Sequence, residues 1–409
     1  MINKENNELL TRVTGDAPMG KMLRQFWVPA VRSARLEPDG DPVRVRLFGK
    51  NYVIFRATDG RVGFFDEGCP HRGVSLLLAR NEDCALTCIF HGWKFDVSGK
   101  VAEVPTEPPE RAASFCEKVP LKHYPVREAG GIVWVWLGEG EQPSQFPMFE
   151  FNTLPDTHVC SRVAITNCNW LQGLEGVIDS AHVGVLHQSS LVKDLSVAKT
   201  RVDLAPHYEF EPQSYGYRGG ALRKMPDGSR YVRITEYVQP WYGLIPFGPE
   251  ENHVVIFATP VDDEHTAQWI VCFNNEQPLT ANDIENFEKA FGLNPNWNPD
   301  NFYNPVGTFD NRWLQDRAML KEHFTGVHSL QIEDFVVQES MGPIVDRSQE
   351  YLGSSDAFVS KVRWHLLTAL QDYQAGKIPR GLEQEISYET IRGTAVILPA
   401  DVDWRTASK

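Results

Sequence analysis

Two short cysteine–histidine motifs are the residues of this chain whose types and spacing best fit a metal centre. The first is Cys69-x-His71, and the second, after 16 further residues, is Cys88-x-x-His91. A structural zinc site usually draws two cysteines from one loop and two histidines from another. Here each motif offers one sulfur and one nitrogen, which favours a [2Fe–2S] cluster with cysteines on one iron and histidines on the other. The motifs therefore predict a centre that carries single electrons, with all four residues as ligands.

A second group of metal-binding residue types lies between positions 169 and 187. If this stretch is a helix, Glu175, Asp179 and His182 share one face, because they are spaced four and three residues apart. His187 follows His182 by five residues, which is about 140° round a regular helix. The two histidines can share a metal only if the helix ends or bends between them, and Gly184 is well placed for that break.

Two histidines and one distant carboxylate would complete a facial triad. This triad leaves coordination positions open on Fe(II) and is typical of non-haem iron oxygenases. The richest source of a carboxylate is the segment 331–339, which contains Asp334. Spacing alone does not choose among Asp334, Asp346 and Asp356 as the third ligand.

Composition limits the classes of function. The chain has 409 residues, is 42% hydrophobic and carries a net charge of −14. A packed globular protein is expected, and a nucleic-acid partner is not, because phosphate binding needs a basic face. The polar N-terminus lacks the apolar core of a signal peptide, and no apolar run reaches membrane-spanning length. With an odd number of cysteines, disulfides are not expected, and the predicted location is the cytoplasm.

The distribution of patterns predicts two domains joined near the polar, turn-rich segment 138–144. We expect an N-terminal segment over 1–26, an antiparallel β domain over 27–140 with both cysteine–histidine motifs in loops, and a mixed domain over 150–409. Strands are expected at Val43–Leu47, Tyr52–Phe55, Val62–Phe65, Gly131–Leu137, Tyr231–Val238, His253–Ala258 and Gln268–Phe273. Helices are expected near 170–183, 281–291, 312–322 and 356–375, and a long Asn- and Pro-rich loop over 294–311.

Together these features resemble the Rieske non-haem iron aromatic-ring oxygenases, in particular the α (oxygenase) subunits of the phthalate dioxygenase-like branch. The resemblance covers most of the chain and rests on Cys69-Pro70-His71-Arg72-Gly73, Cys88-Ile89-Phe90-His91-Gly92-Trp93, Asn169-Trp170-Leu171-Gln172, the run Asp179–His187, Gln338–Ile344 and Asp346-Arg347-Ser348. It implies an α+β chain: an all-β Rieske [2Fe–2S] domain followed by a catalytic domain of the helix-grip type, with an antiparallel sheet flanked by helices.

The resemblance also implies roles for individual residues. It puts one mononuclear Fe(II) on His182, His187 and Asp334, and makes Asp179 the bridge between the two metal centres. In that family an electron passes from the cluster of one subunit to the iron of the next round a trimer. Asp179 would then contact His182 of its own chain and the cluster ligand His91 of the neighbour, in a homotrimer or stacked trimers.

The function implied is the terminal oxygenase component of a multicomponent system. It would use O2 and electrons from an NAD(P)H-dependent reductase, with or without a ferredoxin, to hydroxylate or O-demethylate a phthalate-, benzoate- or vanillate-like acid, including methoxylated lignin-derived compounds. Arg218, Arg223 and Arg233 are candidates for binding the substrate carboxylate. The alternative is a Rieske electron-transfer or scaffold protein without oxygenation chemistry, which predicts a missing iron ligand.

Overall fold

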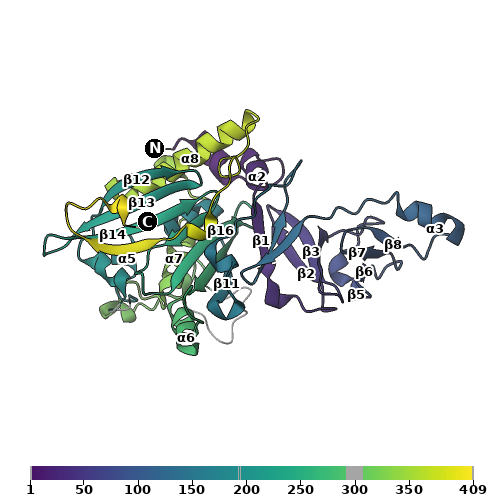
Figure 1. Cartoon of the computed structure of the whole chain (residues 1–409), viewed down its shortest axis with the longest axis horizontal. Coiled ribbons are helices and arrows are strands. Elements are labelled where there is room, and N and C mark those ends of the chain that lie inside the picture. Colours follow the sequence, from purple (N-terminus) through teal and green to yellow (C-terminus); the bar gives the residue numbers. More distant parts are fainter. Residues whose placement is uncertain (1, 192, 194, 292–306, 408–409) are drawn as a thin grey trace. The chain divides into compact units, whose positions relative to one another are not determined.

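The chain forms two compact units in this computed structural model, which describes residues 2–191, 193, 195–291 and 307–407 (Figure 1). One unit comprises residues 24–142, and the other comprises residues 1–23 together with 143–409. The functional boundaries expected at 26/27 and between 140 and 150 remain predictions. Most of the loop expected over 294–311 lies outside the described residues.

The unit of residues 24–142 is built from short antiparallel strands in three sheets, as the alternating sequence pattern predicts. The sheets have the orders β1-β10-β9, β2-β3-β4 and β5-β6-β7-β8. Their strands are β1 (Trp27–Arg32), β2 (Val43–Leu47), β3 (Lys50–Arg56), β4 (Val62–Asp66), β5 (Arg80–Glu82), β6 (Ala85–Thr87), β7 (Lys94–Asp96), β8 (Val101–Glu103), β9 (Val126–Ala129) and β10 (Ile132–Trp136), with one helix, α3 (Pro109–Cys116). The two cysteine–histidine motifs lie in the loops after β4 and β6.

The other unit is centred on one eight-stranded antiparallel sheet. Its order is β11-β17-β16-β15-β14-β13-β12, and β18 pairs with β14. The strands are β11 (Val159–Thr166), β12 (His207–Gln213), β13 (Gly216–Lys224), β14 (Arg230–Val238), β15 (Tyr242–Ile245), β16 (His253–Pro260), β17 (Thr266–Phe273) and β18 (Thr394–Leu398). Most positions of β14, β16 and β17 are buried on both faces, which indicates that helices cover the sheet.

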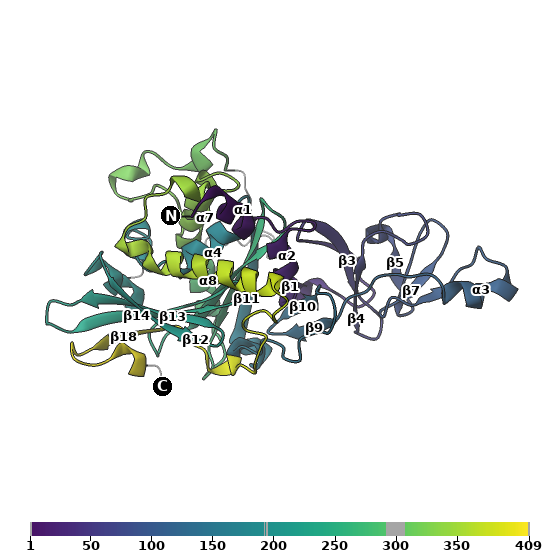
Figure 2. The ribbon, with the colours of Figure 1, turned by 90° about the horizontal axis from the view of Figure 1, so that it is seen from above.

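Helices cover this sheet and position the residues of interest. Helix α4 (Trp170–Ile178) packs against β15, β16 and β17 and against α7 (Leu330–Ser340), whereas α8 (Ala357–Gln374) lies over β12 and β13 (Figure 2). The terminal helices α1 (Lys4–Thr11) and α2 (Pro18–Leu23) pack on α8. The close approach of α4 to β15 needs Gly243, because a Cβ atom there would lie 2.3 Å from Val177 Cγ1.

The structure contains some of the expected helices and strands and lacks others. The strands expected near β14, β16 and β17 are present, as are helices α6 (Ala281–Ala290) and α8. The helix expected over 312–322 is wrong: that segment holds two short 3₁₀ turns, and residues 312–314 have positive φ angles that a right-handed helix does not allow. Helix α7 was not expected. No described helix has the length and apolarity needed to cross a membrane.

Two candidate metal centres

The two cysteine–histidine loops have the same backbone geometry. In each loop the glycine four residues after the cysteine donates its N–H to the cysteine carbonyl, from Gly73 to Cys69 at 2.8 Å and from Gly92 to Cys88 at 2.9 Å. The cysteine N–H in turn donates to the carbonyl of the residue after the glycine, at 2.8 Å in both loops. Both glycines have positive φ angles, +76° and +71°, which favour glycine. The two turns therefore hold Cys69 and Cys88 at equivalent positions, whereas the histidine follows two residues later in the first loop and three residues later in the second.

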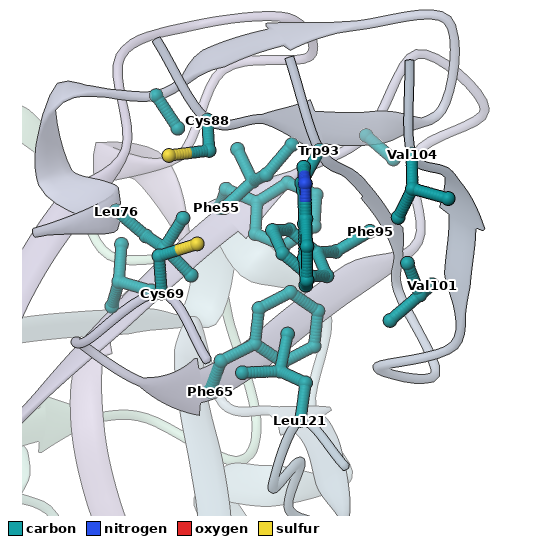
Figure 3. Close-up of a cluster of buried hydrophobic side chains, with 14 residues drawn as sticks. Phe55, Phe65, Cys69, Leu76, Cys88, Trp93, Phe95, Val101, Val104 and Leu121 are labelled. Atoms are coloured by element: carbon teal, nitrogen blue, oxygen red, sulfur yellow. The ribbon is translucent and has the colours of Figure 1, made fainter. Parts of the chain in front are cut away.

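The two sulfur atoms of these loops border the hydrophobic core of their unit. Cys69 and Cys88 are each 3% exposed, and Figure 3 shows both cysteines to one side of Phe55 and Trp93, near Leu76. Burial raises the pKa of the Cys69 thiol to about 11, and the neighbouring Cys88 adds to the rise against hydrogen bonds from the His71 and Arg72 amides. Bound iron would reverse this preference, because a cation stabilises the thiolate form of its ligands.

The two histidines of the loops lie beside each other. The ring centroids of His71 and His91 are 4.5 Å apart at an interplanar angle of 74°, and His71 stacks on Trp93. The Nδ1 atom of His91 is buried and has no hydrogen-bond partner among the described residues. A buried nitrogen without a partner is costly unless it binds something, so its lone pair is available for iron. The donor set of two sulfurs and two imidazoles therefore fits a [2Fe–2S] cluster.

The second candidate centre brings together His182, His187 and Asp334. Asp334 Oδ1 lies 3.4 Å from His182 Nε2 and 3.3 Å from His187 Nε2, and one ligand atom from each residue falls within 4.8 Å of the others. The other two aspartates left open by the spacing are engaged elsewhere: Asp346 accepts from the Ser348 amide, and Asp356 from the Gly353 amide. Of the three candidates, only Asp334 joins the two histidines.

The local fold around the two histidines differs from the expected single helix. Helix α4 ends at Ile178, and Asp179 is its C-cap with an extended backbone. His182 then begins, and His187 ends, the separate short helix α5 (Val183–Leu186). The break therefore precedes both histidines rather than falling at Gly184. Gly184 has a packing role instead, because a Cβ atom there would lie 2.9 Å from the Thr200 carbonyl oxygen.

Asp179 contacts His182 through this turn rather than along a helix face. Its Oδ2 atom lies 3.1 Å from His182 Nδ1, and its Oδ1 atom accepts from the Ala181 amide at 2.7 Å. Burial alone would raise the pKa of Asp179, but the hydrogen bond and charge of His182 hold it below the ordinary value. Glu175, expected on the same face, instead pairs with two buried arginines, Arg347 and Arg363.

Electrostatics around His187 favour a bound cation. The carboxylates of Asp334 and Glu333 outweigh burial and raise the pKa of His187 to about 9. His187 Nδ1 lies 2.8 Å from Glu333 Oε2. Positive charge at this position is therefore stabilised, and a metal ion can take the place of the proton on Nε2. His182, His187 and Asp334 thus fit a mononuclear Fe(II) bound by two nitrogens and one carboxylate.

A cavity of about 680 Å³ opens beside these three residues. This volume is typical of small-molecule sites. Much of its wall is apolar, with contributions from Val177, Val183, Leu191, Leu195, Val197, Ile245, Phe247, Val254, Ile256, Phe287, Phe291 and Leu330. Asp179, Arg233 and Thr235 are among its polar lining residues.

The three candidate arginines differ in their partners. Arg218 is paired with Glu211 and Glu236. Arg223 donates to the carbonyl oxygens of Ser180 and Asp203. Arg233 is 2% exposed and lines the cavity, and its Nε and Nη1 atoms have no partner among the described residues. Of the three, Arg233 is the one with free donors at the cavity, a distinction that the sequence did not reveal.

Comparison with known proteins identifies both parts of the chain. Residues 26–125 match the Rieske [2Fe–2S] domain, and residues 135–409 match the LigXa C-terminal domain-like family. The chain is 40% identical to the phthalate 4,5-dioxygenase oxygenase subunit of Pseudomonas putida, over 99% of this chain and 94% of that protein. It is 34% identical to the 3-chlorobenzoate-3,4-dioxygenase oxygenase subunit of Comamonas testosteroni, over 98% and 97% of the two chains.

More distant comparisons extend the likeness to other reactions and to solved structures. The 5,5'-dehydrodivanillate O-demethylase oxygenase subunit of Sphingobium is 26% identical over 93% of this chain and 84% of that protein. The structure of NdmA from Pseudomonas putida CBB5 with caffeine aligns with a TM-score of 0.64 at 16% identity, over 95% of this chain and all of that one, and so supports the fold. The chain belongs to the Rieske oxygenase family, as an oxygenase (α) subunit of the phthalate dioxygenase type.

Proposed function

We propose that this chain oxygenates an aromatic carboxylic acid, by hydroxylating its ring or by O-demethylating a methoxy group. The observation that carries the proposal is the buried Arg233, whose Nε and Nη1 atoms have no hydrogen-bond partner among the described residues. Arg233 lines the same cavity as His182, His187 and Asp334. An apolar cavity with one buried cation suits a flat apolar ring that bears a carboxylate. Two relatives are named for phthalate and 3-chlorobenzoate, and both compounds belong to this substrate class because they are aromatic carboxylates.

Two metal groups would supply the redox chemistry. Cys69, His71, Cys88 and His91 would hold the cluster, and His182, His187 and Asp334 would hold Fe(II), the group at which O2 is activated when iron is bound. The protein residues would bind, orient and exclude water. Arg233 would fix the carboxylate end of the substrate, and apolar side chains such as Phe247 and Phe287 would enclose the ring.

Asp179 would join the two centres. Its carboxylate holds His182 through Nδ1 and also lines the cavity. We propose that its second contact is His91 of a neighbouring subunit in a homotrimer or in stacked trimers. A carboxylate between two metal-bound imidazoles orients both rings and links electron transfer to the position of a proton.

The electron source would be a separate NAD(P)H-dependent reductase, with or without a ferredoxin. We propose a cytoplasmic location, since the seven cysteines form no disulfide with one another, as expected in a reducing compartment. The alternative of a pure electron carrier is disfavoured, because it predicts a missing iron ligand and the set of His182, His187 and Asp334 is complete.

The test is a substrate panel with product identification. Purified enzyme, a reductase and NADH are incubated with phthalates, benzoates and methoxybenzoates, each paired with its methyl ester, and products are identified by mass spectrometry with formaldehyde measured separately. We expect an oxygenated or demethylated product from at least one acid. Substrate-dependent turnover of the esters but of none of the acids would contradict the proposal.

A variant of Arg233 tests the recognition step. Charge-assisted hydrogen bonds contribute about 1.5–3 kcal/mol, so Arg233→Met is expected to lower kcat/KM for the acid by roughly 10- to 150-fold. Its effect on the matched methyl ester, which carries no charge, should be small. Equal losses for acid and ester would show that Arg233 does not recognise the carboxylate.

A further inference from the structure

We infer that Glu333 is a positioning residue for the mononuclear metal: it fixes the ring of His187 so that Nε2 faces the ion, and Thr325 in turn fixes Glu333. This inference rests on the proposed metal site and adds two residues to it. Neither residue was assigned a role from the sequence, where Glu333 stands only as the neighbour of Asp334.

The contact between Glu333 and His187 is short and fully enclosed. Glu333 Oε2 lies 2.8 Å from His187 Nδ1, and both side chains are at most 2% exposed. A carboxylate can only accept, so Nδ1 must carry the hydrogen. The lone pair of the metal-binding tautomer is then on Nε2, the atom that lies 3.3 Å from Asp334 Oδ1. A carboxylate on the second nitrogen of a ligating histidine is the usual way in which proteins select this tautomer.

The other oxygen of Glu333 is also held. Thr325 Oγ1 donates to Glu333 Oε1 at 2.6 Å, and the same hydroxyl accepts from the Val327 amide at 3.2 Å. With one oxygen on His187 and the other on Thr325, the carboxylate plane cannot rotate without breaking a buried hydrogen bond. Removal of the Glu333 carboxylate or of the Thr325 hydroxyl would therefore loosen the imidazole of His187.

The segment that carries Thr325 is attached to the segment that carries His187. The Phe324 amide donates to Ser189 Oγ at 2.9 Å, two residues beyond the metal-binding histidine. Within the same turn, the amides of Ser190 and Leu191 donate to the His187 carbonyl, at 2.8 and 2.9 Å. Backbone and side chain of His187 are thus held separately, which is expected for a ligand whose ring must not turn.

The Nδ1 atoms of the two histidines of the site contact different carboxylates. His182 Nδ1 lies 3.1 Å from Asp179, whose side chain is 21% exposed, whereas Glu333 is completely enclosed. Asp179 can therefore meet a further partner, but Glu333 cannot. We assign Glu333 a role in metal affinity and geometry, distinct from the electron-transfer role proposed for Asp179.

The experiment measures binding of Co²⁺ to the whole enzyme after its mononuclear metal has been removed with a chelator. Affinity is obtained by competition, and the EPR spectrum of the bound Co²⁺ is recorded with the [2Fe–2S] cluster oxidised and therefore silent. Glu333→Gln is expected to weaken Co²⁺ binding by about 10- to 100-fold and to alter the spectrum. Thr325→Val should produce a smaller loss of the same kind, and Thr325→Ser, which keeps the hydroxyl, should restore wild-type binding.

Glu339→Gln is the matched control, because Glu339 is a buried carboxylate on the same helix that accepts from the Asn167 amide and from Trp313 instead of a histidine. Unchanged Co²⁺ binding in Glu333→Gln, or an equal loss in Glu339→Gln, would overturn the inference. If Glu333→Gln does not fold, equal affinities of Thr325→Val and Thr325→Ser would overturn it. Failure of the wild-type enzyme to bind Co²⁺ would instead contradict the proposed metal site itself.

Discussion

Asp179 Oδ2 lies 3.1 Å from His182 Nδ1, across the turn that separates helices α4 and α5. This contact leaves His182 Nε2 directed at Asp334, and it leaves the Asp179 carboxylate partly exposed. One residue thereby orients a metal ligand and remains available to a second group. The proposed electron route between subunits depends on this double contact.

Replacement of Asp179 by asparagine tests the electron route. Asp179→Asn keeps the size of the side chain and removes its charge, so both metal centres should remain bound while electron transfer to the mononuclear site becomes severely slower. The measurement is the rate at which a reduced cluster is reoxidised in a single turnover with O2 and substrate. Asp262→Asn is a matched control. Asp262 contacts the histidine three positions after it, His265, at 2.8 Å, as Asp179 contacts His182, but neither Asp262 nor His265 lines the cavity. Wild-type rates in Asp179→Asn with full iron occupancy would rule out the bridge.

Loss of His182 should remove the mononuclear iron without removing the cluster. His182→Ala removes one of three proposed iron ligands, so the mononuclear iron is expected to be lost while the visible spectrum of the cluster is retained. Iron analysis and absorption spectroscopy of the same sample check both parts. Disappearance of the cluster spectrum in this variant would indicate that the proposed division between cluster and mononuclear iron is wrong.

The cysteine–histidine spacing predicted the cluster loops because those ligands are local: each pair lies within four residues and is placed by one tight turn. The choice of Asp334 depends on the family resemblance. Its approach to His182 requires helix α7, and the sequence pattern of that segment does not predict a helix. The break after Ile178 was missed because Asp179 ends the helix by using its side chain for the Ala181 amide. The free donors of Arg233 are a property of three-dimensional packing, as Arg218 and Arg223 have the same residue type and strand context.

The buried ion pairs made by Glu175 of helix α4 should be essential for stability. Glu175 is paired with Arg347 and Arg363, whose side chains are 0% and 3% exposed. Glu175→Gln leaves the buried guanidinium of Arg347 without a carboxylate partner among the described residues, and it leaves Arg363 paired with Glu350 alone. This loss is expected to cost about 3–5 kcal/mol in the free energy of unfolding. Urea unfolding checks this value, with the exposed pair of Glu285 and Lys289 as a comparison in which Glu285→Gln should leave the midpoint unchanged. A loss below about 1 kcal/mol would show that the arginines find other partners.

A buried histidine away from the metal sites should make stability pH-dependent. His365 lies between Tyr217 and Tyr237, its Nε2 atom is 2.6 Å from Gln239 Oε1, and burial lowers its pKa to about 4 from 6.5. Between pH 6.5 and 4 the unfolded chain binds a proton that the folded chain excludes, so stability falls as pH falls through this window. The resulting loss in the free energy of unfolding reaches about 3 kcal/mol near pH 4 and is absent above pH 7.

His365→Phe should remove that part of the pH dependence. Unfolding midpoints of wild type and variant are measured from pH 7.5 to 4.5, and the wild-type midpoint should fall relative to that of the variant as the pH falls. His207→Phe, at a histidine whose side chain is 77% exposed, is the control and should not change the slope. A constant difference between wild type and His365→Phe at all pH values would contradict the assignment.

We propose that electrons from the cluster are used at the His182, His187 and Asp334 site to oxygenate an aromatic acid. The most direct measurement is a single turnover of enzyme whose cluster has been reduced and whose reductant has been removed, mixed with O2 and an acid accepted in the panel. We expect oxidation of the cluster together with an oxygenated or demethylated product in the wild type, and no product in His182→Ala. Cluster oxidation without product in the wild type, or equal product from the variant, would contradict it.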